Sequence, residues 1–549
     1  VGLSELWNII KALMISEFVL IALIIGLTPV PKPLQFLPLP EFKGFPRSIF
    51  IIDGIISLVL IASIRISKRL FLEIISAKGL VKKGKRTLII GAGHTGETIL
   101  RNITREGLSE FYPVCLLDDD PQKIGSFIHG IKIGGKISQL KEAIKKWEVE
   151  AIIIAIPSLD FKVLRGIYDS AKELNVNIIK IVPSFYDFHK PDLNIKNLEE
   201  IRIEDLIGRQ AIRINYEEIE TFLKDKVILI TGAGGSIGAE IALQVCRFNP
   251  QKLILFDIDE TELYTLDLKL KRMFPLLKEK LFPLTGDIRD EERIKEVLST
   301  YTPQIVFHSA AYKQVPIMEY NPKEAVKVNM LGTYNVVRAS VENNIKKFIL
   351  ISTDKAIRPT SVMGATKRMA EYIGSAFNEL GKTEFIAVRF GNVLGSRGSV
   401  LPLFLEQLKH GGPLTVTHPE MQRYFMTIPE AVALVLQASV IGKGGEVLVL
   451  DMGKPVKIVQ LAEELIKIHR LEPYKDIEIE FIGLRPGEKL FEEILTKEEG
   501  MVVSRHEKIF IAQNTEKYSL EEIREILNEF TQLILSLIHI SEPTRPLYI

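Results

Sequence analysis

An acid and an amine stand side by side at the end of one predicted strand. The run Lys347–Ile351 is typical of a buried strand, and Ser352-Thr353-Asp354-Lys355 follows it directly. Met363 and Lys367 come next, four residues apart, so both lie on one face of a predicted helix. An adjacent carboxylate and amine can move protons to and from a bound substrate. We therefore expect a catalytic cluster made of Thr353, Asp354, Lys355, Met363 and Lys367.

A glycine-rich turn lies upstream of this cluster, after the strand-like run Val227–Ile230. Backbone N–H groups in such a turn can approach the phosphates of a dinucleotide. Asp257 ends the next strand, where a carboxylate accepts from the ribose of NAD and repels the 2′-phosphate of NADP. Since no arginine adjoins Asp257, we expect NAD as the cofactor. The alternative interpretation of Asp257 is a solvated acid at a strand end. The expected cofactor contacts of the turn are Thr231, Gly232, Gly235, Ser236, Ile237 and Gly238.

A second glycine motif occurs earlier, where Gly91, Gly93 and Gly96 follow the apolar run 87–90. Asp118 ends the next predicted strand and is placed to accept from a ribose hydroxyl. No cluster of acids, bases or nucleophiles follows this motif. Two interpretations stay open, a second nucleotide site formed by these four residues or a nucleotide fold that serves as a scaffold.

Strand-like and helix-like segments alternate in two series, which predicts right-handed βαβ units and parallel sheets. The expected fold class is α/β, with two tandem Rossmann-like, doubly wound domains preceded by transmembrane helices. The predicted parts are a membrane segment 1–72, a first nucleotide-binding-like domain 83–190, a connector 191–223, a catalytic domain 224–515 with a C-terminal substrate-binding lobe, and a non-native tail 535–549.

Two apolar runs, Ala12–Pro31 and Ser48–Ile64, each contain a single acidic residue and are candidate membrane helices. Two buried core helices are the alternative. Lysines and arginines gather after residue 64, which places the later domains on the cytoplasmic side of a bacterial inner membrane. Because the chain starts at Val1 without an initiator methionine, we expect missing N-terminal residues. The tail resembles a translated sequencing adapter.

The composition excludes several other classes of protein. A net charge of +1 indicates no broad nucleic-acid surface. Two cysteines in unrelated contexts and nine scattered histidines predict neither a disulfide framework nor a metal site.

Four long motifs, in the same order along the chain, resemble those of membrane-bound UDP-N-acetylglucosamine 4,6-dehydratases. These enzymes form part of the extended branch of the short-chain dehydrogenase/reductase superfamily. The motifs occupy residues 311–319, 351–371, 389–399 and 485–489, and the resemblance extends over about residues 5–515. It implies a lyase that uses NAD to convert UDP-GlcNAc to a UDP-4-keto-6-deoxy sugar for bacterial polysaccharide or glycan assembly. We also expect a homo-oligomer.

The resemblance implies roles for the catalytic cluster. Asp354 is the acid toward the C6 oxygen, Lys355 is the base toward C5, and Lys367 holds the nicotinamide ribose. Burial is expected to raise the pKa of Asp354 and to lower that of Lys355. Met363 stands where the superfamily has a tyrosine and carries no ionisable proton. We hypothesise that Asp354, as a carboxylate, takes the C4 hydroxyl proton through Thr353 or a water.

The same resemblance implies further contacts with the cofactor and the substrate. The additional cofactor contacts are Asp287, Ile288, Ala310 and Ala311. The substrate contacts are Lys313, Glu319, Asn392, Arg397, Arg423, Arg485 and Glu488.

Two rival functions remain. A nucleotide-sugar epimerase shares the cofactor and the oxidation at C4, but it needs no acid at C6. A catalytically silent, NAD(H)-sensing membrane regulator would explain Met363 and the doubled nucleotide fold.

Overall fold

The computed structural model describes residues 84–538 apart from 106–109, 157–158, 183–197, 201–213, 470, 494–499 and 514–515, together with residues 56, 60 and 63. Among these residues, no helix combines the length and the apolar character needed to cross a membrane. The two candidate membrane helices lie outside the described residues apart from three positions, and so does the tail beyond residue 538.

The first sheet has seven strands within the described residues, in the order β3-β4-β2-β1-β5-β6-β7. The pairs β1–β2 and β2–β4 are parallel, whereas β3 and β7 pair antiparallel at the two edges. The strands are β1 Lys85–Ile90, β2 Phe111–Leu117, β3 Phe127–Ile128, β4 Ile131–Gly135, β5 Ala151–Ile154, β6 Ile178–Ile181 and β7 Glu199–Glu200. The helices are α3 His94–Arg105, α4 Leu140–Trp147 and α5 Phe161–Glu173.

The second sheet has nine strands within the described residues, in the order β10-β9-β8-β11-β12-β13-β18-β22-β21. Pairing is parallel from β10 to β18, and β22 and β21 add an antiparallel edge. The strands are β8 Val227–Thr231, β9 Lys252–Asp257, β10 Leu281–Thr285, β11 Ile305–His308, β12 Lys347–Ile351, β13 Glu384–Arg389, β18 Val447–Leu450, β21 Met501–Val503 and β22 Ile509–Ala512. The chain order reverses between β8 and β11, where a doubly wound sheet opens a crevice.

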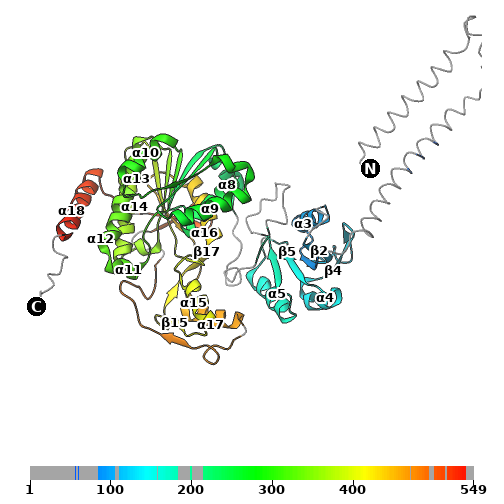
Figure 1. The fold of residues 1–549 in the computed structure, drawn as a ribbon. Coiled ribbons are helices and arrows are strands. Elements are labelled where there is room, and N and C mark those ends of the chain that lie inside the picture. The colour runs from blue at the N-terminus through cyan, green and yellow to red at the C-terminus, as the bar shows by residue number, and fades with distance from the viewer. Residues whose placement is uncertain are drawn as a thin grey trace, which may run out of the picture. The chain divides into compact units, whose positions relative to one another are not determined.

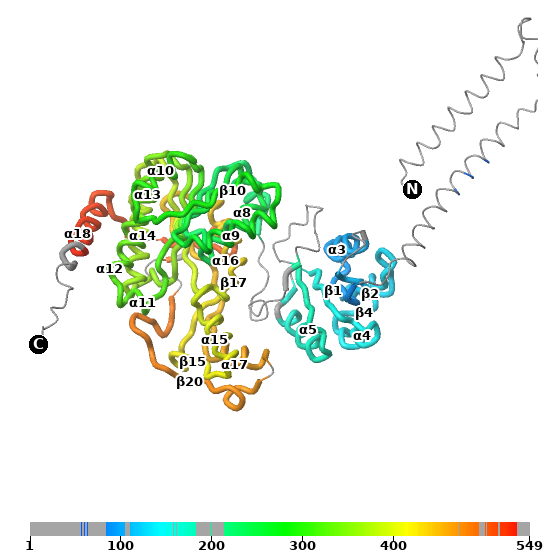
Figure 2. Tube along the Cα trace, viewed as in Figure 1, coloured from blue at the N-terminus to red at the C-terminus, as the bar shows by residue number. Residues whose placement is uncertain are grey.

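Helices cover both faces of this second sheet (Figures 1 and 2). One face packs under α7 Tyr216–Leu223, α8 Ser236–Cys246, α9 Glu260–Met273 and α16 Ile428–Ile441. The other packs under α10 Glu291–Tyr301, the π-helix Val326–Gly332, α13 Thr333–Glu342, α14 Val362–Asn378 and α18 Leu520–Ile538. The short helices α11 Val315–Tyr320 and α12 Pro322–Ala325 precede the π-helix. Central strands such as β8 are buried along their whole length, which explains their continuous apolar sequence.

A small lobe follows β13 and holds its own apolar core around α15 Val400–Lys409 and α17 Ile458–Ile468 (Figure 2). Its strands pair two by two. The pairs are β14 Asn392–Leu394 with β17 Phe425–Thr427, β15 Leu414–Val416 with β20 Ile479–Phe481, and β16 Gln422–Arg423 with β19 Val456–Lys457. The two predicted Rossmann-like sheets are thus confirmed.

Candidate active site

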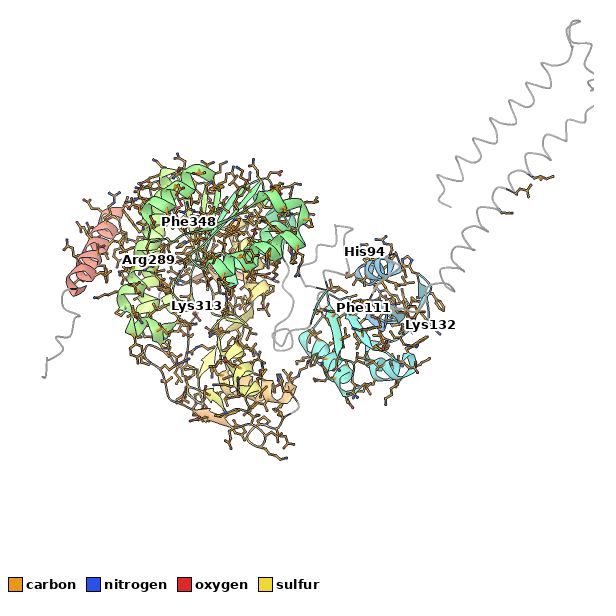
Figure 3. All side chains as sticks on the ribbon, in the orientation of Figure 1. His94, Phe111, Lys132, Arg289, Lys313 and Phe348 are labelled. Atoms are coloured by element: carbon orange, nitrogen blue, oxygen red, sulfur yellow. The ribbon has the colours of Figure 1, made fainter. Side chains whose placement is uncertain are left out.

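A cavity of about 490 Å³ opens at the carboxyl ends of β8, β11 and β12. Its wall combines the glycine-rich turn, the segment after β11, the end of β12, the start of α14 and the small lobe. Lys313 lies between the sheet and this lobe (Figure 3). The predicted site residues that line the cavity are Gly232, Gly235, Ser236, Ile237, Gly238, Ala311, Lys313, Thr353, Lys355, Met363, Lys367, Asn392, Arg397, Arg423, Arg485 and Glu488.

The other predicted residues of the catalytic domain lie outside the cavity wall. They are Thr231, Asp257, Asp287, Ile288, Ala310, Glu319 and Asp354. The Asp287 carboxylate is engaged by Arg289, whose Nε donates to it at 2.8 Å. The Glu319 carboxylate accepts from the backbone N–H of Val362 at 2.7 Å and so fixes the first residue of α14.

The glycine-rich turn is packed so closely that side chains would not fit. Gly232 has φ 70°, in the left-handed region that favours glycine. A Cβ on Gly238 would lie 2.1 Å from the carbonyl oxygen of Gly232. Oδ2 of Asp257 accepts from the backbone N–H of Gly234 at 2.7 Å, which ties the end of β9 to the turn. The turn and its carboxylate therefore form a cradle that fits a dinucleotide.

Arg397 reaches from the small lobe to this turn. Its guanidinium donates to the carbonyl oxygen of Gly234 and lies 2.7 Å from the carboxylate of Glu262. Its backbone N–H donates to Oγ of Ser236 at 3.1 Å. Burial and the nearby charge of Arg397 lower the pKa of Lys313. Lys313 and Arg397, on separate elements, thus line the part of the cavity beside the turn, where a cation would neutralise phosphate, and Arg397 already shares its charge with Glu262.

The predicted catalytic cluster has a defined hydrogen-bond pattern. Oδ1 of Asp354 accepts from Oγ1 of Thr353 at 2.9 Å and from Nζ of Lys355 at 2.9 Å. Nζ of Lys355 also donates to Oδ1 of Asn392 at 3.0 Å. Asp354 is 2% exposed and lies behind Thr353, which does line the cavity. A proton can therefore pass between the cavity and Asp354 along the threonine hydroxyl.

The expected lowering of the Lys355 pKa is wrong. Burial does lower it and is the largest single influence. The carboxylates of Asp354 and Glu492, with the hydrogen bond to Asp354, outweigh burial, so the pKa of Lys355 is raised. Lys355 is therefore an ammonium group in this arrangement and has to lose a proton before it can act as a base.

Met363 and Lys367 lie on the cavity side of α14, as the four-residue spacing predicts. Met363 is 2% exposed and packs with Val315 and Met318. Nζ of Lys367 donates to the carbonyl oxygen of Ile351 at 2.7 Å. Burial lowers the pKa of Lys367 to about 8, against the opposing charge of Glu371.

The predicted substrate arginines differ in what they bind. Arg423 is buried, and its guanidinium donates to the carbonyl oxygens of Lys489 at 2.7 Å and Leu490 at 3.2 Å. It therefore holds the segment that carries the fourth motif. Arg485 is half exposed and donates to the carboxylate of Glu488 at 2.7 Å, so these two side chains form a pair at the cavity wall.

Glu492 is a cavity-lining residue that sequence reasoning missed. It is 8% exposed, and its Oε1 lies 3.5 Å from Nζ of Lys355. No sequence pattern marks Glu492 as a site residue, because it stands in an ordinary run of charged and apolar residues.

Asn329 is a second residue that the sequence did not single out. It lies in the π-helix, a form of helix frequent at functional sites. Its Oδ1 accepts from the backbone N–H of Tyr312 at 2.8 Å, and its Nδ2 donates to Oγ1 of Thr366 at 3.0 Å. Asn329 thereby joins the segment after β11 to α14 on two sides of the cavity.

His308 ends β11 and is fully buried. Its Nδ1 lies 2.7 Å from Oγ1 of Thr231, and its Nε2 lies 3.0 Å from Oγ1 of Thr333. Burial lowers the pKa of His308 to about 3, so it is neutral and fixes the ends of β8 and β11.

The first sheet carries its glycine motif in the expected place. Gly91, with φ 102°, and Gly93 form the turn after β1, and Gly96 lies in the first turn of α3. Oδ2 of Asp118 accepts from the backbone N–H of Ala92 at 2.7 Å, and its Oδ1 accepts from the backbone N–H of Asp120 at 2.9 Å.

Asp257 makes the same two bonds in the second sheet, to the N–H groups of Gly234 at 2.7 Å and Asp259 at 2.9 Å. The difference is Lys123, whose Nζ lies 3.4 Å from the Asp118 carboxylate. Burial raises the pKa of Asp118, but its backbone hydrogen bonds and Lys123 outweigh burial and leave the pKa lowered.

The strand order of the second sheet, with its cavity at the reversal point, is that of a doubly wound nucleotide-binding fold. The family match and the relatives given next place the molecule in the extended short-chain dehydrogenase/reductase class. Residues 228–514 match the family described as polysaccharide biosynthesis protein, and the chain belongs to that family. Residues 5–183 match a family described as a CoA-binding domain.

Three comparisons show what the chain is similar to. It is 43% identical, over 93% of its length and 82% of the relative's, to the capsular polysaccharide biosynthesis protein CapD of Staphylococcus aureus. It is 37% identical, over 50% of its length and 79% of the relative's, to a UDP-glucose 4-epimerase of Rickettsia rickettsii. The X-ray structure of Pen from Bacillus thuringiensis matches with TM-score 0.50 and 35% identity, over 56% of this chain and 98% of that one.

Proposed function

We propose that this protein is an NAD-dependent lyase that removes water from UDP-N-acetylglucosamine. The product is a UDP-4-keto-6-deoxy sugar for polysaccharide or glycan assembly. The observation that carries the proposal is the contact of Asp354, which lies behind the cavity wall, with the two wall residues Thr353 and Lys355. Elimination requires an acid and a base together, whereas redox exchange alone does not.

NAD would be held by the glycine-rich turn and by Asp257, with Lys367 toward its nicotinamide ribose. When bound, it accepts a hydride from C4 of the sugar and returns one to C6, so it is regenerated in each turnover. A carboxylate already bound to the turn at Gly234 supports NAD rather than NADP.

Asp354 would take the C4 hydroxyl proton through Thr353, because the threonine hydroxyl already donates to it at 2.9 Å. Asp354 would thereby take the role of the superfamily tyrosine, whose position Met363 occupies here. Asp354 would then give that proton to the departing C6 oxygen, which leaves as water. The amine of Lys355 would take the C5 proton that the C4 ketone makes acidic.

The uridine diphosphate would lie along the small lobe. Lys313 and Arg397 would meet its phosphates at the wall, although Arg397 shares its charge with Glu262, and Asn392 is fixed by Lys355 at the sugar end. The Arg485–Glu488 pair would meet the nucleotide, with the guanidinium toward phosphate and the carboxylate toward ribose hydroxyls.

The test incubates the full chain with UDP-GlcNAc and NAD⁺ and weighs the product. Loss of one water from the nucleotide sugar is the expected result. Unchanged mass with a new stereoisomer would instead establish an epimerase, the function that the similarity to an epimerase relative favours. No turnover, with NAD(H) bound, would favour the silent regulator.

We further propose that residues 1–72 anchor the protein in the bacterial inner membrane with the catalytic domain in the cytoplasm, and that the chain forms homo-oligomers. The support is the pattern of apolar runs and basic flank in the sequence. Fractionation of cells tests the anchor. The full chain is expected with the membranes, and removal of residues 1–72 is expected to release it.

A further inference from the structure

Glu492 is a buried carboxylate beside the amine of the catalytic cluster. Its side chain is 3% exposed, and its Oε1 lies 3.5 Å from Nζ of Lys355 and 3.8 Å from Nε of Arg423. Its Oε2 is buried and, among the described residues, has no hydrogen-bond partner. Because burying a charged oxygen without a partner destabilises a fold, such an oxygen in a cavity wall calls for a functional explanation.

Among the residues that the structure describes, few charges face Glu492. Lys355 faces it from the end of β12, with Asp354 on the other side of the same ammonium. Arg423 faces it from β16, but its guanidinium is committed to the carbonyl oxygens of residues 489 and 490. The carboxylate of the neighbouring Glu493 lies 4.0 Å from the guanidinium of Arg358 instead. The close partner of Glu492 is therefore Lys355.

A count of protons shows what this partner is for, given the proposed function. Dehydration takes one proton from the C4 hydroxyl and one from C5 before the C6 oxygen receives any. Asp354, as a carboxylate, accepts the first. Lys355 is an ammonium group and can accept none. The sequence-predicted cluster is thus short of one proton acceptor.

We propose that Glu492 is this acceptor and that it works through Lys355. The N–H bond of the Lys355 ammonium breaks, its proton moves to the Glu492 carboxylate, and the neutral amine then takes the C5 proton. Asp354 returns the C4 proton to the C6 oxygen, which leaves as water. Lys355 finally returns a proton to C5 and regains one from Glu492, so every group ends as it began. Glu492 is therefore a positioning residue that keeps Lys355 ready to act as a base.

The test compares the wild type with Glu492→Gln in D₂O, with UDP-GlcNAc and NAD⁺. We expect the variant to retain NADH formation, because Asp354 and Thr353 are untouched. The rates of water loss and of deuterium incorporation at C5 should both fall by about 100-fold, a typical contribution of acid–base catalysis to the rate. Glu492→Asp, which keeps a carboxylate, should recover part of the loss. Glu493→Gln is the matched control and should behave as the wild type.

A merely electrostatic Glu492 predicts the opposite result. Its charge helps to raise the pKa of Lys355. Its removal would then leave more neutral amine, so elimination would be as fast or faster, and the ascending limb of the pH profile, where Lys355 loses its proton, would lie at lower pH. That outcome overturns the inference and leaves the proposed function standing, whereas a wild type that releases no water overturns the proposed function first. If Glu492→Gln fails to fold, Glu492→Asp decides, because C5 deuteration must slow more than NADH formation does.

Discussion

Asp354 is bound on one oxygen by two different donors, the hydroxyl of Thr353 and the ammonium of Lys355. In the proposed reaction it serves at both C4 and C6. Asp354→Asn should therefore abolish NADH formation and water loss together, each by about 10²–10⁴-fold. Absorbance at the NADH band and product mass measure the two steps separately.

Asp225→Asn is the matched control for this change. Asp225 is exposed and has φ 56°, a conformation that asparagine adopts readily. It should keep full activity. Retained NADH formation in Asp354→Asn would assign the C4 proton to another group.

Lys367 links the site to the dependence of stability on pH. Burial lowers its pKa to about 8, whereas the unfolded chain keeps a lysine protonated to about pH 10.4. Between these values the unfolded state binds the extra proton, so the contribution of Lys367 to the free energy of unfolding rises with pH. Below about pH 8 Lys367 is charged in the folded state as well, and its burial then lowers the free energy of unfolding by the full amount.

Urea unfolding of the wild type and Lys367→Met measures this effect. The wild type should gain on the order of 2 kcal/mol relative to the variant between about pH 8 and pH 10. A difference that does not vary with pH would show that the buried amine keeps an ordinary pKa.

At the scale of elements, a buried ion pair joins β12, β13 and α14 beneath the cavity. Nε and one terminal nitrogen of Arg389 donate to the two carboxylate oxygens of Glu371 at 2.8 and 2.7 Å, and Oγ of Ser352 donates to the same carboxylate at 2.5 Å. Arg389→Met leaves the carboxylate uncompensated and should destabilise the fold by about 3–5 kcal/mol. Lys475→Met, which breaks an exposed pair with Glu472, should cost at most about 1 kcal/mol in the same denaturant titration.

The glycine-rich turn gives a second prediction for an element. Gly238→Ala places a methyl group against the Gly232 carbonyl and should push α8 away from β8, with lower stability and weaker NAD binding. Gly166→Ala is the control, because a Cβ at that position in α5 meets nothing within 4 Å. It should stabilise the protein by about 0.5–1 kcal/mol, since alanine is the better helix former. Equal melting temperatures for both variants would contradict the close packing of the turn.

At the scale of the whole molecule, two sheets carry the same carboxylate-to-turn geometry at Asp118 and Asp257. We expect the full chain to bind two equivalents of adenine nucleotide in a calorimetric titration. Asp118→Asn should remove one and leave dehydration intact, whereas Asp257→Asn should weaken the other and slow dehydration. A single equivalent in the wild type would make the first sheet a scaffold.

Most of the architecture was predictable because strand and helix periodicity is local. The ends of parallel strands meet at one edge, so Gly232, Asp354 and Lys367 could be brought together from sequence. Glu492 could not, because Arg423 and Lys489 position its segment through hydrogen bonds to distant main-chain carbonyls. The pKa of Lys355 was mispredicted because the prediction considered burial alone, whereas the charges of Asp354 and Glu492 and the hydrogen bond to Asp354 outweigh burial.

The contact of Arg397 with the glycine-rich turn bears on how readily a bound dinucleotide exchanges with the NAD pool of the cell. The same side chain touches Gly234 in the turn and Glu262 in α9, while its backbone belongs to the small lobe. We expect the lobe to slow exchange of the dinucleotide with the surrounding pool. Flux through the enzyme would then follow the supply of sugar nucleotide and be insensitive to the NAD⁺/NADH ratio, so growth on reduced or oxidised carbon sources would leave glycan output unchanged.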